Sequence, residues 1–200
     1  MSYDLFENIE YQNLENLFNI CKKDSNFIDG VRIEYLKKNQ FFLESLNFLI
    51  DINLINITKN SVSILSKPNI DFSTSLFTNL SKNTEYALSL KSYLSNFINQ
   101  NSSFSFKPNP LYNNLTSNLR NFLISSNKIT YENEEYIISD NKLLDLFKNK
   151  EFSPEQLQNV LENRNKIGLE AEKLVVKYEI EKIKSLNQGL KIDHVALRDV

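Results

Sequence analysis

The 200-residue sequence has one cysteine, one histidine and no tryptophan, and only 3 glycines and 4 prolines. A single cysteine excludes an internal disulfide, and one cysteine with one histidine cannot form a multi-cysteine zinc site. The shortage of glycine and proline argues against a turn-dense β-sandwich and favours helices. Cys21 falls in line with Leu14, Leu17 and Phe18 on one helix face, so we predict a buried structural thiol.

Charge and apolar runs limit the function classes further. The net charge of −2 provides no bulk attraction to nucleic acid, so any DNA contact must come from a local patch. Hydrophobic residues make up 41% of the sequence, which is enough for a folded core. The most apolar run, residues 41–50, is too short to span a bilayer and contains Glu44. With no recognisable signal peptide, a cytoplasmic protein without membrane contact is expected.

The first segment, residues 1–66, predicts three helices and a hairpin. The first helix is centred on residues 14–21, the second is a short helix around residues 33–36, and the third runs from residue 40 to residue 51. Residues 54–65 alternate in polarity around a polar turn and predict a β-hairpin. Three helices followed by a hairpin are the order of elements in a winged helix-turn-helix.

The second segment, residues 67–150, follows a boundary at Pro68. Its pattern predicts a helix over 82–99, a short strand at Phe104-Ser105-Phe106, a helix over 113–126 and a second hairpin over 129–138.

The two segments also repeat one another. The tetrapeptide Asn-Phe-Leu-Ile at 47–50 recurs at 121–124, and residue 121 lies 74 positions after residue 47. The same offset carries Val62 onto Tyr136 without a gap. Shared identity, order and spacing indicate a shared fold. We therefore predict a mainly α protein with small β-hairpins (α+β), in which tandem winged helix-turn-helix units precede a long helix and a short terminal strand.

The last segment, residues 151–200, begins with a clear helix start. Ser153-Pro154-Glu155-Gln156 has a capping serine, a proline at the first helical position and a glutamine that completes a capping box. The helix is predicted to end at Asn187-Gln188-Gly189, and Leu190 to Leu197 is predicted as a strand. One apolar stripe is expected on this helix, formed by Ile167, Ala171, Leu174, Val175, Tyr178, Ile183 and Leu186.

Part of this segment resembles a known family. The residues are Gly168, Ala171-Glu172, Val175, Tyr178-Glu179, His194-Val195 and Asp199. Over about the last 35 residues they resemble the opening of the NO VEIN C-terminal domain, a PD-(D/E)XK restriction-endonuclease-like nuclease. The family continues with a Gly-Tyr-Asp segment and a metal-holding Glu-Val-Lys strand, neither of which occurs before Val200.

The resemblance implies a role for Glu172 as the one candidate catalytic carboxylate. A complete domain of this family would require Mg²⁺, which carboxylates bind and which activates water for phosphodiester cleavage. Without the later strands this chain is expected to hold no cofactor or metal and to be inactive. For the chain as it stands, an ordinary surface glutamate paired with Lys173 or Lys177 is the favoured interpretation. His194, alone on an apolar segment, is interpreted as structural.

Candidate DNA contacts lie in both winged-helix units, because asparagine, serine and arginine suit base edges and a wing-tip lysine suits phosphate. In the second unit Glu132, Glu134 and Glu135 would repel phosphate, and in the first unit Glu44 and Asp51 favour a protein surface. At any single candidate, a solvated side chain without function is the preferred alternative. The candidates are Lys59, Asn60, Asn114, Ser117, Asn118, Arg120 and Asn121.

Two functional hypotheses follow. The first is a DNA-targeting or assembly module of a bacterial restriction or anti-phage defence nuclease. The second is a non-catalytic protein–protein interaction module that self-associates through the 154–186 helix. DNA, a protein partner and a second copy of the chain are the partners that these hypotheses leave open.

Overall fold

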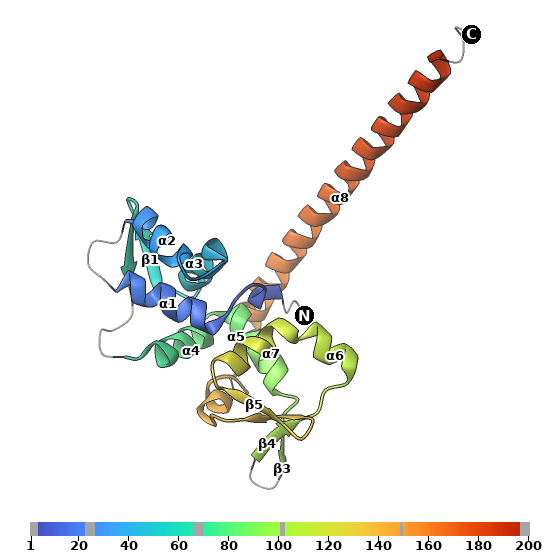
Figure 1. Ribbon diagram of the computed structural model, residues 1–200. Helices are drawn as coiled ribbons and strands as arrows, with labels where there is room; N and C mark the ends of the chain where they lie inside the picture. Colours follow the sequence, from blue (N-terminus) through green and yellow to red (C-terminus); the bar gives the residue numbers. More distant parts are fainter. Residues whose placement is uncertain (1–3, 23–26, 66–69, 101–102, 149, 197–200) are drawn as a thin grey trace. The chain divides into compact units, whose positions relative to one another are not determined.

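A computed structural model describes residues 4–22, 27–65, 70–100, 103–148 and 150–196. The protein is mainly helical with small antiparallel hairpins, as predicted (Figure 1). It divides into two compact units, Met1–Glu151 and Phe152–Val200.

The first unit begins with one helix-and-hairpin segment. A 3-10 turn, η1 (Asp4–Phe6), precedes three helices and two antiparallel strands. These are α1 (Tyr11–Cys21), α2 (Ile28–Leu36), α3 (Phe42–Asp51), β1 (Ile55–Thr58) and β2 (Ser61–Ile64). Phe27, just before α2, forms an isolated antiparallel bridge with Ser61. The segment therefore has three helices followed by a hairpin, in the order that the sequence predicted.

The second segment of this unit repeats that order with additions. Its helices are α4 (Phe72–Lys82), α5 (Thr84–Leu94), α6 (Pro110–Leu115) and α7 (Ser117–Ser125), followed at the end by a π-helical turn, η2 (Leu144–Lys148). Its strands are β3 (Ile98–Gln100), β4 (Ser103–Phe106), β5 (Ile129–Glu132) and β6 (Glu135–Ile138). They form one antiparallel sheet in the order β3-β4-β6-β5. This segment also ends with helices followed by a hairpin, α6 and α7 and then β5 and β6.

Two helix predictions in this segment need correction. The helix expected over 82–99 ends at Leu94; residues 95–97 connect it to β3, and residues 98–99 are part of that strand. An additional helix, α4, begins after Asp71, whose carboxylate accepts a hydrogen bond from the Thr74 N–H at 2.9 Å. The helix expected over 113–126 is divided at Thr116 into α6 and α7.

The backbone has the same conformation after α3 as after α7. Asn53 follows α3 and Asn127 follows α7, both in the left-handed region with φ of 56°. The next residue closes the same bond in each case, from the Leu54 N–H to the Leu49 carbonyl and from the Lys128 N–H to the Leu123 carbonyl, both at 2.9 Å. This is the Schellman arrangement, in which asparagine is a tolerated left-handed residue.

The hairpins repeat as well. The wing tips have left-handed pairs at Lys59-Asn60 and at Asn133-Glu134, the geometry of a type I′ turn. The strand register is also equivalent, since Ile55 faces Ile64 and Ile129 faces Ile138. The 74-residue repeat therefore extends to the conformation of the turns.

An aromatic cluster joins the two segments into one unit. Phe48 of α3 and Phe122 of α7 are equivalent in the repeat, and their ring centroids lie 6.0 Å apart. Phe6 contacts both, at 5.9 Å from Phe48 and 4.9 Å from Phe122. Tyr86 packs against Phe6 and Phe48, and all four side chains are buried. The two helix-and-hairpin segments thus share a core.

The second unit consists of one helix, α8 (Pro154–Ala196), in its described part. Its start has the predicted capping box: the Gln156 N–H donates to the Ser153 hydroxyl at 3.2 Å, and the Ser153 N–H donates to the Gln156 side-chain oxygen at 3.0 Å. The predicted end at 187–189 and the strand at 190–197 are wrong, because α8 continues to Ala196. Residues 197–200 lie outside the described part. A lone strand has unpaired backbone groups, whereas a helix pairs them internally.

Candidate interaction surfaces

Arg120, the one cation on α7, contacts other residues of its own winged helix. Its guanidinium donates to the Asn113 carbonyl at 2.6 Å, to the Asn113 side-chain oxygen, and to the side chain of Asn121. The guanidinium carbon lies 5.7 Å from the centroid of the Tyr136 ring, and the Tyr136 hydroxyl donates to Asn113. Arg120 thus connects α6, α7 and β6, and contact with a base edge would compete with these bonds.

The other predicted DNA contacts are distributed over several elements. Asn114 is exposed but belongs to α6, and Ser117 and Asn118 are half-buried on α7. Lys59 and Asn60 are exposed at the β1–β2 turn. Their role in DNA binding stays a prediction.

Acidic and apolar side chains occupy the β5–β6 wing and the surface of α3. The β5–β6 wing has Glu132 and Glu134 exposed and Glu135 half-buried. The Lys107 ammonium pairs with Glu134 at 2.5 Å, which raises the pKa of Lys107 and lowers that of Glu134. In the first helix-and-hairpin segment, helix α3 is the equivalent of α7. It has no basic residue, and it presents Leu43, which is 61% exposed, beside the exposed Glu44. Counterion release on DNA needs cations at such positions.

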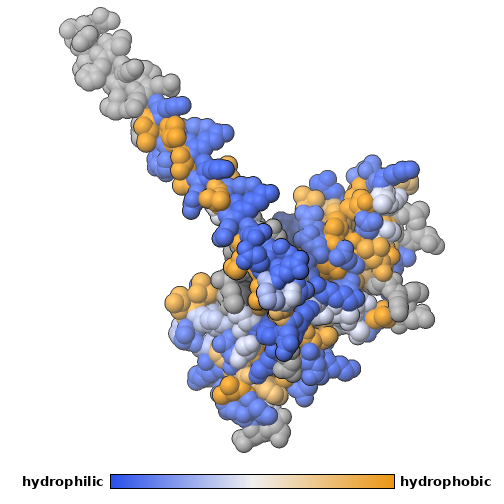
Figure 2. All heavy atoms as spheres, turned by 180° about the vertical axis from the view of Figure 1, so that it is seen from behind, coloured by the Kyte–Doolittle hydropathy of each residue, from blue (hydrophilic) through white to orange (hydrophobic). Residues whose placement is uncertain are grey.

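Helix α8 exposes a series of large apolar side chains. Figure 2 shows hydrophobic side chains interrupting the polar surface along it. The exposed large apolar side chains are Leu157, Leu161, Leu169, Leu174, Val175, Val176, Tyr178, Ile180 and Ile183. Among the predicted stripe, Leu174, Val175, Tyr178 and Ile183 are exposed, while the side chains of Ile167, Ala171 and Leu186 lie outside the described part.

A second apolar face was missed by the sequence analysis. Leu169, Val176 and Ile183 recur at intervals of seven residues, and Ile180 lies between the last two. Helical geometry places these four side chains on one side and Leu174 with Tyr178 on another. The seven-residue interval could have predicted this face from the sequence, but the prediction followed the larger stripe centred on Leu174.

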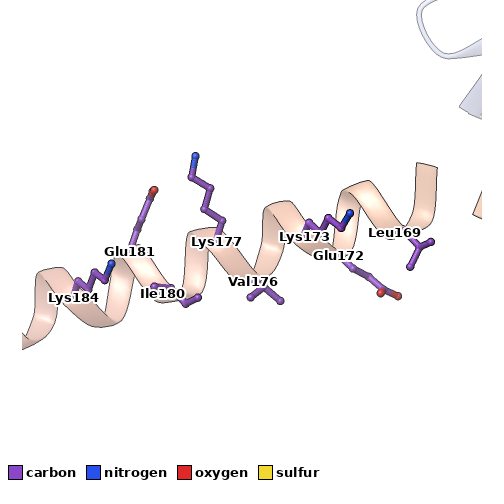
Figure 3. A pocket seen from close by; sticks show the side chains of 8 residues that line it. All are labelled: Leu169, Glu172, Lys173, Val176, Lys177, Ile180, Glu181 and Lys184. Atoms are coloured by element: carbon purple, nitrogen blue, oxygen red, sulfur yellow. The ribbon is translucent and has the colours of Figure 1, made fainter. Parts of the chain in front are cut away.

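Polar side chains border this second face and make it a shallow groove. Figure 3 shows Leu169, Val176 and Ile180 along one edge of α8, with Glu172 on their side and Lys177 pointing away. The lining residues are Leu169, Glu172, Lys173, Val176, Lys177, Ile180, Glu181 and Lys184. Since all of them belong to one helix, the groove is a helix surface and not an enclosed ligand site.

The predicted catalytic residue, Glu172, does not belong to a metal-binding cluster in the described part of the chain. Glu172 is exposed on α8, and no cluster of three or more His, Cys, Asp or Glu side chains suited to a metal occurs in the described part of the chain. Cys21 is buried as predicted, and burial raises its pKa to about 12. The side chain of His194 lies outside the described part. No helix among the described residues is long and apolar enough to cross a membrane.

Comparisons with known proteins return no relative. No family model matches the sequence, and no curated protein or solved structure matches it either. The resemblance of the last segment to the NO VEIN C-terminal domain stays a prediction.

Proposed function

We propose that the protein is a non-catalytic assembly module that self-associates through α8. The observation that supports this most directly is the series of exposed apolar side chains on α8, with Leu169, Val176 and Ile183 each more than half exposed. Complete burial of one such side chain is worth about 1.5–3 kcal/mol, so a partner that covers several of them gains a large free energy. The acidic and apolar surfaces of the winged helices also suit protein contacts.

The nuclease hypothesis remains the second candidate, and one observation favours it. Leu174 and Tyr178 expose a different face of α8 from Val176 and Ile180, so the helix has more apolar surface than one partner helix covers. A globular domain built around α8 would cover both faces. Incubation with supercoiled DNA and Mg²⁺ tests activity, and we expect no cleavage by these 200 residues.

Light scattering after size exclusion tests the assembly proposal. The chain mass is 23.4 kDa, and we expect twice that value for the wild type. Ile180→Asp, which places a carboxylate in the apolar face, is expected to weaken association about 100-fold or more. Leu111→Asp on α6 is the matched control, because Leu111 is also exposed, at 70%, and lies outside α8. A wild-type chain that stays at the single-copy mass, or a dimer that Leu111→Asp dissociates while aspartate substitutions on α8 leave it intact, would reject the proposal.

A further inference from the structure

We infer that two copies of α8 pair in parallel and in register, along the face formed by Leu169, Val176, Ile180 and Ile183. This inference rests on the proposed self-association and adds to it the face, the direction and the register.

The spacing is that of a heptad repeat. Leu169, Val176 and Ile183 are seven residues apart and take the d positions. Lys173 and Ile180 then fall at the a positions, four residues after a d. Alternating steps of four and three residues produce a seam that a second helix can cover by knobs-into-holes packing. Lys173 is a polar residue at a, which costs stability but helps to fix the register.

The charges beside the seam decide the direction. Glu172 and Glu179 occupy g positions, and Lys177 and Lys184 occupy e positions; all four are exposed. In a parallel pair a g residue faces the e residue five positions further along the second copy. Glu172 therefore faces Lys177 of the second copy, and Glu179 faces Lys184 of the second copy. Symmetry doubles both pairs, which makes four attractive contacts.

An antiparallel pair on the same seam has the opposite electrostatics. There g positions face g positions and e positions face e positions, so Glu172 and Glu179 meet glutamates while Lys177 and Lys184 meet lysines. Like charges at these positions disfavour a pairing.

The other apolar face lacks this complementarity. If Leu174 is placed at d and Tyr178 at a, Lys177 falls at g and faces Lys182 of the second copy at e. That contact is repulsive in a parallel pair. Charge complementarity thus selects the face of Val176 and Ile180 over that of Leu174.

Disulfide trapping tests the direction and the register. Leu169→Cys and Ile183→Cys are made separately in the full chain and oxidised mildly. The native Cys21 is not expected to cross-link, because it is buried and burial raises the pKa of its thiol to about 12. A parallel in-register pair places each d residue beside its own counterpart, so each variant should cross-link with itself. An antiparallel pair places each d residue beside an a residue of the second copy, so neither variant would cross-link with itself, and that result would overturn the inference.

Charge exchange tests the electrostatic argument independently. Glu172→Lys with Glu179→Lys converts four attractive contacts into repulsive ones and should weaken association at least about tenfold. Adding Lys177→Glu and Lys184→Glu restores opposite charges and should return the affinity to near the wild-type value. An unchanged affinity in the double variant would refute the predicted pairing.

The face is tested by comparing two aspartate variants. We expect Ile180→Asp to dissociate the pair and Leu174→Asp to leave it intact. A pair that is lost with Leu174→Asp and retained with Ile180→Asp would overturn this inference while leaving the proposed function standing. A monomeric wild type would refute both.

Discussion

Replacing Arg120 with alanine separates a structural role from a DNA-contacting one. The side chain makes hydrogen bonds to Asn113 and Asn121 and a ring contact with Tyr136, and it is half-buried. A hydrogen bond involving a charged group contributes about 1.5–3 kcal/mol, and a cation–π contact at a partly exposed site about 0.5–1 kcal/mol. Partial replacement of these bonds by water leaves an expected loss of about 2 kcal/mol in the free energy of unfolding.

Urea unfolding of the full chain, followed by circular dichroism, measures this loss. Arg32→Ala on α2 is the matched control, because Arg32 is exposed and its truncation is expected to change stability by less than about 0.5 kcal/mol. A DNA-binding titration at low and moderate salt accompanies both variants. If Arg120→Ala keeps wild-type stability but abolishes a salt-sensitive DNA affinity, the structural explanation of Arg120 is refuted.

Three further predictions concern pH, turn conformation and catalysis. The Lys128 ammonium donates to the Asp140 carboxylate at 2.8 Å and lowers the pKa of that carboxyl. The pair therefore stabilises the fold at pH values above the pKa that Asp140 has in the unfolded chain. This contribution is lost as the pH falls through the lower pKa that Asp140 has in the folded chain. Asp140→Asn should therefore reduce the acid dependence of the melting temperature, and an unchanged dependence would contradict this. Asn127→Ala should cost about 1 kcal/mol in the free energy of unfolding while Asn127→Gly costs less, because residue 127 is left-handed and alanine adopts that conformation less readily than glycine; equal values from denaturant titration would contradict this. DNA incubated with the chain and Mg²⁺ should stay supercoiled, and cleavage that disappears in Glu172→Ala would establish a catalytic role for Glu172.

The repeated helix-and-hairpin architecture could be predicted because several independent signals coincide. The apolar tetrapeptide at 47–50 recurs at 121–124, and asparagine follows each copy where a left-handed residue is needed. Helix α4 was missed because its start depends on the single cap of Asp71, in a stretch rich in serine and threonine. Such residues favour caps and turns as readily as helices.

The interaction surfaces were less predictable because they depend on which side chains find internal contacts. The polar pattern of α7 suggested that Arg120 faces solvent. Its contacts lie on α6, which is a separate helix, and on Tyr136 of β6, and periodicity alone does not bring these elements together. The terminal strand was predicted from apolar residues alone, without a second strand to pair with. On α8 the residues of two apolar faces alternate along the sequence. The helical period therefore indicated the broader face, around Leu174, and the face of Val176 and Ile180 was overlooked.

Sedimentation equilibrium of the intact wild-type chain, over a range of concentrations, tests the central claim most directly. Self-association through α8 predicts a reversible transition between one and two copies of the 23.4 kDa chain, with Ile180→Asp remaining at the single-copy mass. A single-copy mass at every concentration for the wild type would contradict the account.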